Sequence, residues 1–151
     1  MKLTTLCYIE KDDKLLMLYR NKKENDQSNG KWLGVGGKLE KGESPDDCVL
    51  REVKEETGLT LTDYRLRGMV TFISDVWDDE MMFLYSGYDY EGELDLNCSE
   101  GELKWIPKDD IMDLSLWEGD RIFLRELLGD SNNINIKLVY QDDKLVDWIK
   151  Y

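Results

Sequence analysis

Apolar and polar positions alternate along most of the chain in a way that predicts a largely β structure. Short runs rich in aliphatic, β-branched and aromatic residues are separated by polar turns, which is typical of half-buried strands. The runs that predict strands are residues 3–9, 15–19, 65–75, 80–88, 102–106, 134–140 and 145–150. A polar turn from Lys11 to Lys14 separates the first two runs, so we expect these strands to pair as a hairpin. Residues 21–31 are polar and end in Asn29-Gly30, which predicts a loop.

Residues 44–58 carry the clearest helical pattern in the chain. Ser44 is a good N-cap, Pro45 suits the first helical position, and Gly58 is a typical C-terminal stop. The helical period places four residues on one stripe, which we expect to face the core: Val49, Leu50, Val53 and Thr57.

A second helix is predicted over residues 120–128, where apolar residues recur at helical spacing before Gly129. Many short strands combined with two or three helices indicate a mixed α/β or α+β fold.

The length of 151 residues fits one domain, and no repeat or linker divides the chain, so we expect a single domain over residues 1–151. The β-like tail after residue 130 fits either a closing hairpin on the same sheet or a partner surface.

The amino-acid composition excludes several classes of catalytic and metal-binding site, mainly because the chain lacks the residues that they need. The chain has no histidine, which excludes a Ser-His-Asp triad, a histidine general base and a histidine metal ligand. Three widely spaced cysteines fit neither a zinc motif nor a disulfide framework: Cys7, Cys48 and Cys98. The net charge of -13 argues against binding nucleic acid or anionic membranes through charge. No apolar run approaches the ~20 residues of a membrane span and no secretory signal is evident, so we expect a cytoplasmic protein.

One face of the first predicted helix carries three carboxylates, on Glu52, Glu55 and Glu56. Like charges three and four residues apart repel, so this arc is either a solvated acidic face or an oxygen cage for a hard divalent cation. Arg51 precedes Glu55 by four residues and is placed to hold it by an ion pair. The upstream residues 34–38 are rich in glycine, which lets backbone groups approach a ligand. A glycine-rich turn leading into a Glu-rich helix fits a site for phosphate and metal.

Residues 37–59 resemble the complete sequence motif of the Nudix hydrolase family, the Nudix box. The family pattern is G-x5-E-x7-R-E-U-x-E-E-x-G-U, in which U is a bulky apolar residue. Every fixed position is matched in this chain, by Gly37, Glu43, Arg51, Glu52, Val53, Glu55, Glu56, Gly58 and Leu59. The resemblance implies the Nudix fold, an α/β/α sandwich around a mixed β-sheet. It also implies hydrolysis of a nucleoside diphosphate linked to another group, with Mg²⁺ or Mn²⁺ as cofactor.

Carried over position by position, the resemblance implies a role for each charged residue of the box. The expected metal ligands are the carbonyl of Gly36 and the carboxylates of Glu52, Glu55 and Glu56. Glu43 and Arg51 are expected to brace the box through an ion pair. Metal ions neutralise phosphate charge and lower the pKa of bound water, so a carboxylate suffices as general base. Glu52 is the first candidate for that base.

The chain as a whole resembles the MutT/MutX-type 8-oxo-dGTP diphosphatases of this family. The match over residues 97–107 implies that Glu100 is a further metal ligand and a rival general base. The match near residue 117 implies that Trp117 stacks on a purine and that Asp120 binds its Watson–Crick edge. The other residues expected to contact substrate are Lys23, Leu33, Gly37 and Lys38. Two departures affect base recognition: Leu33 stands where the mammalian enzyme has an asparagine, and Gly119 replaces one acid of a pair.

These features predict an Mg²⁺-dependent pyrophosphohydrolase that converts 8-oxo-dGTP, or related oxidised purine deoxynucleoside triphosphates, to the monophosphate and pyrophosphate. Such an activity would serve nucleotide-pool sanitation. The alternatives are hydrolysis of an ordinary dNTP, a nucleotide sugar or a dinucleoside polyphosphate, and a Nudix domain that binds nucleotide without cleaving it. The intact acidic positions of the box argue against the last. We expect a nucleoside triphosphate as the binding partner, neither nucleic acid nor membrane, and a monomer or a homodimer.

Overall fold

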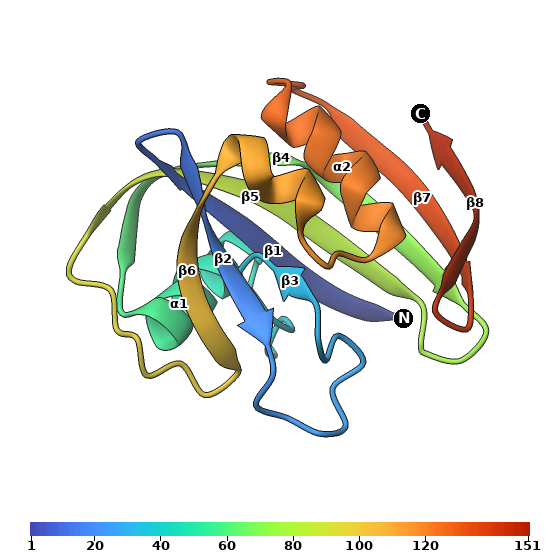
Figure 1. The fold of residues 1–151 in the computed structure, drawn as a ribbon, viewed down its shortest axis with the longest axis horizontal. Helices are drawn as coiled ribbons and strands as arrows, with labels where there is room; N and C mark the ends of the chain where they lie inside the picture. Colours follow the sequence, from blue (N-terminus) through green and yellow to red (C-terminus); the bar gives the residue numbers. More distant parts are fainter.

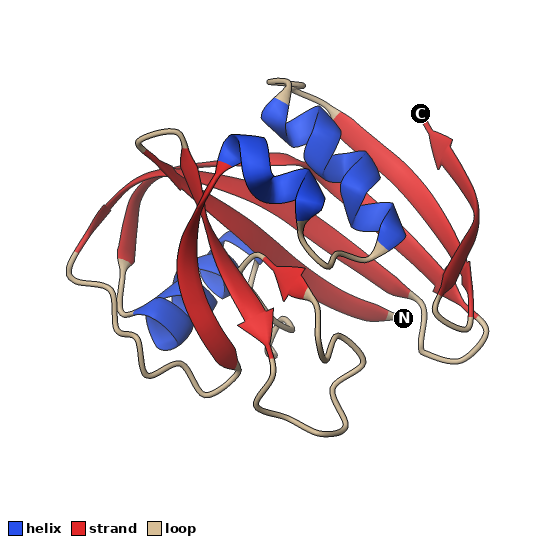
Figure 2. Ribbon diagram, in the orientation of Figure 1, coloured by secondary structure: helices blue, strands red, loops and turns tan.

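A computed structural model describes all residues from 1 to 151 and contains eight strands, two α-helices and one short 3-10 helix (Figures 1 and 2). In chain order the elements are β1 (Lys2–Lys11), β2 (Lys14–Arg20), β3 (Trp32–Leu33), α1 (Pro45–Thr57), β4 (Thr60–Ser74), β5 (Glu80–Glu91), β6 (Gly101–Pro107), η1 (Lys108–Asp113), α2 (Glu118–Leu128), β7 (Ile134–Gln141) and β8 (Lys144–Lys150). Neither α-helix has the length and hydropathy that crossing a membrane requires.

The strands form one mixed sheet in the order β3-β2-β1-β5-β4-β7-β8, with β6 paired to β2 outside this path. The pairs β1–β5 and β4–β7 are parallel, and the remaining pairs are antiparallel. The tail forms the hairpin β7–β8 at one edge of the sheet, as in the first of the two arrangements that the sequence allows. The expected mixed architecture of strands and helices is confirmed.

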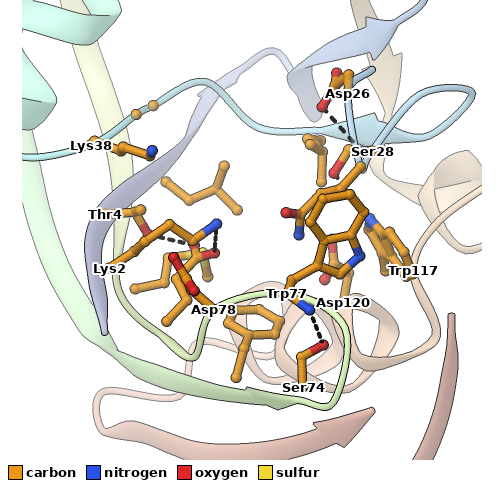
Figure 3. A pocket seen from close by; sticks show the side chains of 18 of the residues that line it. Lys2, Thr4, Asp26, Ser28, Lys38, Ser74, Trp77, Asp78, Trp117 and Asp120 are labelled. Carbon is orange, nitrogen blue, oxygen red and sulfur yellow. Dashed lines mark hydrogen bonds and ion pairs between the residues drawn. The ribbon is translucent and has the colours of Figure 1, made fainter. Parts of the chain in front are cut away.

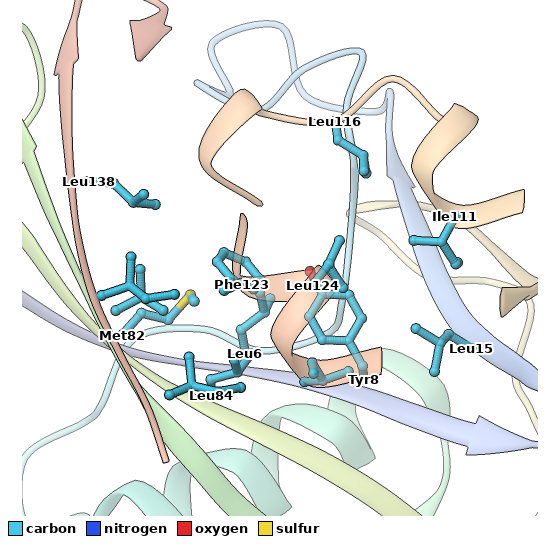
Figure 4. Close-up of a cluster of buried hydrophobic side chains, with 14 of the residues drawn as sticks. Leu6, Tyr8, Leu15, Met82, Leu84, Ile111, Leu116, Phe123, Leu124 and Leu138 are labelled. Atoms are coloured by element: carbon cyan, nitrogen blue, oxygen red, sulfur yellow. The ribbon is translucent and has the colours of Figure 1, made fainter. Parts of the chain in front are cut away.

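Each face of the sheet packs against one α-helix, because successive residues of a strand point to opposite sides. Leu6 and Tyr8 of β1 join the hydrophobic cluster beneath α2, which also contains Phe123 (Figure 4). Cys7 and Ile9 join the cluster beneath α1. This arrangement gives the α/β/α sandwich that the sequence leads us to expect.

The first two strands form a hairpin only at their turn, which corrects the simple pairing expected from sequence. They pair through Glu10 with Leu15 and through Lys11 with Lys14, and then diverge. Strand β1 continues in parallel with β5, and β2 continues antiparallel to β6. The reason is burial, since six consecutive residues of β1 and four of β2 are buried on whichever side they point. Diverging strands can each be covered on both faces.

The glycine-rich segment occupies the edge of β1 that β2 leaves free. The amide of Cys7 donates to the carbonyl of Val35 at 2.7 Å, and the amide of Thr5 donates to the carbonyl of Gly37 at 2.9 Å. A Cβ at Gly36 would lie 2.0 Å from the carbonyl oxygen of Thr5. Only glycine permits this approach, so the segment is fixed against β1 by its lack of side chains.

Helix α1 follows the sequence signals closely. Ser44 accepts a hydrogen bond from the amide of Asp47, Pro45 opens the helix, and Gly58 ends it with φ of 80°. The expected apolar stripe is buried except at Leu50, which is only partly buried, while Cys48 is fully buried instead. Cys48 lies beneath the glycine-rich segment, where its Sγ is 3.5 Å from the carbonyl oxygen of Gly37. A small side chain is needed there because the backbone approaches so closely.

Three further boundaries differ from the sequence expectation. Strand β4 begins at Thr60, five residues earlier than predicted, and helix α2 begins at Glu118. The 3-10 helix η1 was not predicted; it follows Pro107, whose fixed φ ends the preceding strand. Element ends depend on tertiary contacts and hydrogen bonds that a local pattern does not contain.

Arg67 is a buried cation whose partners are neutral groups on β5 and at or just after the C-terminal end of α2. Its guanidinium donates to the carbonyls of Leu127 and Ser131 and to the hydroxyl of Ser86, and only 2% of the residue is exposed. These bonds connect the helix end to β4 and β5 and satisfy carbonyls that the helix leaves unpaired.

We expect Arg67→Met to lower the free energy of unfolding by about 2–3 kcal/mol, because buried carbonyl groups lose their donors. Urea denaturation measures the effect, and Arg65→Met at an exposed position of the same strand serves as the control, with an expected change of about 0.5 kcal/mol or less. Equal losses in the two variants would contradict a structural role for the Arg67 hydrogen bonds.

Candidate active site

The glycine-rich segment presents the free backbone carbonyl of Gly36 beside the acidic face of α1. The carbonyls of Val35 and Gly37 bind amides of β1, whereas the Gly36 carbonyl accepts no hydrogen bond within the protein. The amide of Gly36 donates to Oε2 of Glu56 at 3.2 Å. The segment therefore contacts α1 directly and leaves an oxygen available to a ligand.

Arg51 is the centre of a charge network that joins the loop before α1 to the helix itself. Its Nε and Nη2 donate to the two oxygens of Glu43 at 2.7 and 2.8 Å, a bidentate pair. Its Nη1 lies 2.7 Å from Oε1 of Glu52 and 3.3 Å from Oε2 of Glu55. Nη2 also donates to the carbonyl of Lys38 at 3.1 Å. This hydrogen bonding lowers the pKa of Glu43 to about 2.

The three carboxylates of the acidic arc lie in different environments. Glu55 is 59% exposed, whereas Glu52 is 16% exposed and lies against Gly37, where a Cβ would come within 2.6 Å of the carboxylate. Glu56 is largely buried, and burial, then the nearby charge of Glu52, raises its pKa to about 8 despite the hydrogen bond from the Gly36 amide. Glu52 and Glu56 are thus held close together at the loop.

Glu100 reaches this region from the loop that immediately precedes β6. Its Oε1 accepts from Nζ of Lys23 at 2.8 Å, and its Oε2 lies 3.2 Å from Nη2 of Arg20. The negative charge of Glu100 adds to the raised pKa of Glu56, so the two carboxylates are electrostatic neighbours. Lys23 contacts Glu100 and does not line the large cavity described below.

As they stand, no three or more Asp, Glu, Cys or His side chains are arranged closely enough to hold a metal ion. Arg51 holds Glu52 and Glu55, and Arg20 and Lys23 hold Glu100. The donor set nevertheless fits a hard divalent cation, because it consists of carboxylates and one unpaired carbonyl. The glycine at position 37 leaves space for the Glu52 carboxylate beside that carbonyl. Glu100 and Glu52 would exchange their ion pairs for the cation.

A cavity of about 410 Å³ adjoins the glycine-rich segment (Figure 3). It is lined by six of the residues expected to bind metal or substrate, namely Leu33, Gly36, Gly37, Lys38, Trp117 and Asp120. Its size is that of a small-molecule site. Within residues 37–59, Gly37 and Lys38 line the cavity, whereas the carboxylates of Glu52, Glu55 and Glu56 lie outside its lining. Most of the other lining residues are polar.

Trp117 forms a fixed wall of this cavity. Its Nε1 donates to Oγ of Ser28 at 3.1 Å, and its ring meets that of Tyr140 edge to face at 5.5 Å. The ammonium of Lys31 lies 5.4 Å from the ring centroid. These three contacts hold the indole from its polar edge, from its side and from one face.

Asp120 lies in the floor of the cavity and is 3% exposed. Burial, and secondarily the charge of Glu80, raises the pKa of its carboxyl to about 8. One of its oxygens, Oδ2, has no hydrogen-bond partner. A buried, largely protonated carboxyl with a free oxygen can both donate and accept a hydrogen bond, which suits the edge of a nucleobase.

The neighbouring Gly119 has no room for the acid that the resemblance would place there. A Cβ at this position would lie 2.5 Å from Cδ1 of Leu138 and 2.6 Å from the hydroxyl of Tyr140. The Tyr140 hydroxyl accepts a hydrogen bond from the Gly119 amide at 2.8 Å. Tyr140 therefore occupies the space that an acidic side chain at residue 119 would need. Of the two adjacent acids that the resemblance implies, this chain has only Asp120.

We expect the stability of the protein to fall as the pH rises from about 4 to about 8, partly because of Asp120. Its pKa is raised in the folded protein from 3.8 to about 8, so the folded state binds a proton that the unfolded state releases in this range. The stabilising proton is fully present below pH 4 and is lost as the pH passes 8.

Urea denaturation of Asp120→Asn across this range should therefore give a flatter pH profile than that of the unmodified protein. Other groups such as Glu56 titrate in both proteins, so the difference between the two profiles isolates Asp120. Parallel profiles would contradict the raised pKa.

Sequence reasoning missed part of the cavity wall. Lys2, Thr4, Phe72, Trp77, Asp78, Glu80 and Tyr140 line it, and none was singled out beforehand. They come from β1, β4, β5, β7 and the loop between β4 and β5, which meet only in the folded sheet. The sole local signal is a tryptophan beside an acid between two predicted strands, at Trp77 and Asp78.

Comparison with known proteins decides the family. Residues 2–127 match the NUDIX domain family. The chain belongs to the Nudix family. Members of this Nudix family are hydrolases that generally use divalent metals, and this chain is accordingly a Nudix hydrolase acting on a nucleotide.

Individual relatives agree with this family assignment, and some of them have a named activity whereas others do not. The chain is 36% identical over 120 residues to the uncharacterized Nudix hydrolase YvcI of Bacillus subtilis, covering 77% of this chain and 72% of the relative. It is 29% identical over 129 residues to the oxidized purine nucleoside triphosphate hydrolase of Danio rerio, covering 84% and 80%. The crystal structure of the MutT protein from Bacillus halodurans superimposes with a TM-score of 0.90 at 28% identity, covering 99% and 97%.

Proposed function

We propose that this Nudix hydrolase converts purine nucleoside triphosphates, with 8-oxo-dGTP and related oxidised purine deoxynucleotides preferred, to the monophosphate and pyrophosphate. The observation that carries the proposal is one cavity that is lined by Gly37 and Lys38 of the Nudix box and also by Trp117 and the buried acid Asp120. The phosphates would lie at Gly36, Gly37 and Lys38, and the base would reach Trp117 and Asp120. The similarity to the Danio rerio hydrolase supports this choice of substrate.

Asp120 is the residue that would distinguish purines in this proposal. Its raised pKa lets the carboxyl donate a hydrogen bond to an acceptor of the base and accept one from a donor. Leu33 offers no hydrogen bond at the position where an asparagine is expected, and Tyr140 replaces the second acid. Base recognition would therefore depend on fewer polar contacts than in the mammalian enzyme, with correspondingly weaker discrimination.

The chain's own residues would act as follows in the hydrolysis. Glu52, held between Gly37 and Arg51, accepts a proton from the attacking water while the new P–O bond forms. The anhydride bond to the pyrophosphate leaving group breaks, and its oxygen carries away the negative charge. Bound Mg²⁺ or Mn²⁺, held by the Gly36 carbonyl and by Glu52, Glu56 and Glu100, with Glu55 at the exposed edge, would neutralise phosphate charge and acidify water. Arg51 and Glu43 keep Glu52 in position.

A panel of nucleotides tests the substrate assignment. kcat/KM is measured in Mg²⁺ for 8-oxo-dGTP, dGTP, ADP-ribose and diadenosine tetraphosphate, with pyrophosphate or phosphate release followed directly. The proposal requires 8-oxo-dGTP to be the best substrate of the four and dGTP to follow it. A clear preference for ADP-ribose or diadenosine tetraphosphate would replace this proposal with another Nudix hydrolase activity, and nucleotide binding without turnover would show a non-catalytic domain.

A further inference from the structure

A second tryptophan, Trp77, enters the cavity from the loop between β4 and β5 (Figure 3). The residue is 44% exposed, so its ring is accessible to a ligand that enters the cavity. Acidic residues on both sides of it in the sequence, Asp75 and Asp78, keep the rest of this loop polar. Trp77 is thus the one large apolar side chain that the loop presents to the cavity.

The backbone of this loop is held in place by side-chain hydrogen bonds. Oγ of Ser74 accepts from the amides of Val76 and Trp77 at 3.1 and 2.9 Å. Oδ1 of Asp75 accepts from the amide of Asp142 at 2.8 Å, which joins the loop to the turn between β7 and β8. The loop therefore supports Trp77 at the cavity mouth before any ligand binds.

The two cavity tryptophans differ in the number of side-chain contacts that their indole rings already make within the protein. Trp117 has the hydrogen bond to Ser28, the edge contact with Tyr140 and the Lys31 ammonium over its ring. Trp77 makes no aromatic pair, no cation–π contact and no side-chain hydrogen bond in the structure. An incoming planar ring can stack on Trp77 without displacing a partner, whereas Lys31 already lies over Trp117.

We propose that Trp77 is a specificity-determining residue that stacks on the base of the bound purine nucleotide, while Trp117 serves as a preformed wall. The inference rests on the proposed function, which supplies a purine as the ligand. Stacking on an aromatic ring favours large, flat bases and is insensitive to the exocyclic groups of the base. Trp77 therefore selects purines as a class, and Asp120 reads the base edge.

The experiment compares Trp77→Ala and Trp77→Phe with Trp148→Ala, a control at a tryptophan that is 48% exposed and lies on β8 outside the cavity. Dissociation constants are measured by calorimetry for dGMP and, separately, for inorganic pyrophosphate, both in Mg²⁺. Trp77→Ala should weaken dGMP binding about tenfold and leave pyrophosphate binding unchanged. Trp77→Phe, which keeps an aromatic face, should restore most of the affinity, and Trp148→Ala should match the unmodified protein.

Two further readouts separate stacking from a structural effect. Quenching of tryptophan emission by dGMP should be reduced in Trp77→Phe while binding persists, because one of the two cavity indoles is gone and Trp117 remains. On the substrate of the panel, Trp77→Ala should raise KM about tenfold with kcat nearly unchanged. Equal weakening of dGMP and pyrophosphate, or unchanged dGMP affinity in Trp77→Ala, would overturn the inference.

The result is distinguishable from a failure of the proposed function. If dGMP binding depends on Trp77 but no purine triphosphate is hydrolysed, the stacking residue stands and the assigned reaction fails. If purine triphosphates are hydrolysed and Trp77→Ala leaves both KM and dGMP affinity unchanged, the reaction stands and the role of Trp77 fails.

Discussion

Glu52→Gln should lower kcat for the preferred nucleotide by about 1000-fold, because glutamine cannot accept the proton of the attacking water. The side chain keeps its size, and its amide oxygen can still accept the hydrogen bond from Arg51, so the fold should persist. Steady-state kinetics in saturating Mg²⁺ give kcat, and urea denaturation checks that stability is retained. The effect should fall on kcat more than on KM, because the proton transfer belongs to the chemical step.

The matched control is Glu102→Gln, which removes one carboxylate from an exposed position of β6 and should leave kcat within about twofold. Glu100→Gln, measured alongside, tests the rival base. If Glu52→Gln turned over at a near-normal rate while Glu100→Gln lost activity, the general base would be Glu100. In that case the contact between Glu52 and Arg51 would serve positioning alone.

Arg51→Met should lower kcat/KM by about 100-fold, as expected for a residue that positions metal ligands. Methionine retains much of the volume but removes the bidentate pair with Glu43 and the contacts to Glu52 and the Lys38 carbonyl. Glu52 then loses the Arg51 guanidinium that holds its carboxylate beside Gly37. The activity should also require a higher Mg²⁺ concentration, because the carboxylates are no longer held in place before the metal binds.

Arg125→Met, at an exposed position of α2, controls for the loss of one positive charge and should leave both kcat/KM and the Mg²⁺ requirement nearly unchanged. A titration of activity against Mg²⁺ concentration separates the two variants. An unchanged Mg²⁺ requirement in Arg51→Met, together with near-normal kcat/KM, would show that the network around Arg51 does not organise the site.

Local signals in the sequence were enough to predict helix α1 and most of the strands. The cap at Ser44, the stop at Gly58 and the apolar stripe between them act within a few residues, so they can be read without tertiary information. The same holds for the Nudix box, whose fixed positions lie within one loop, one helix and the next turn. Strand pairing was harder, because the partner of β1 along most of its length is β5, far away in the sequence.

The site residues that lie close together in the sequence could be predicted. Those that come from distant strands and loops could not. Glu43, Arg51, Glu52 and Glu56 were named from the box, and Trp117 and Asp120 from the family resemblance. Trp77 and Tyr140 were missed, because their strands and loops meet at the cavity only after the sheet has formed. No spacing rule links residues 77, 117 and 140 in the chain.

The sequence by itself determined the chemistry that this protein carries, because carboxylates, glycines and an arginine at fixed spacing in one helix and its flanking loops define their own geometry. The tertiary structure decided which of these groups are buried, which are paired with another side chain and which have no partner. Burial gives Asp120 and Glu56 their raised pKa values, and Tyr140 excludes a side chain at Gly119. The tertiary structure also left the Trp77 ring without a partner at the cavity mouth. These properties arise from desolvation and close packing between distant segments, which exist only once the sheet and its two helices have assembled.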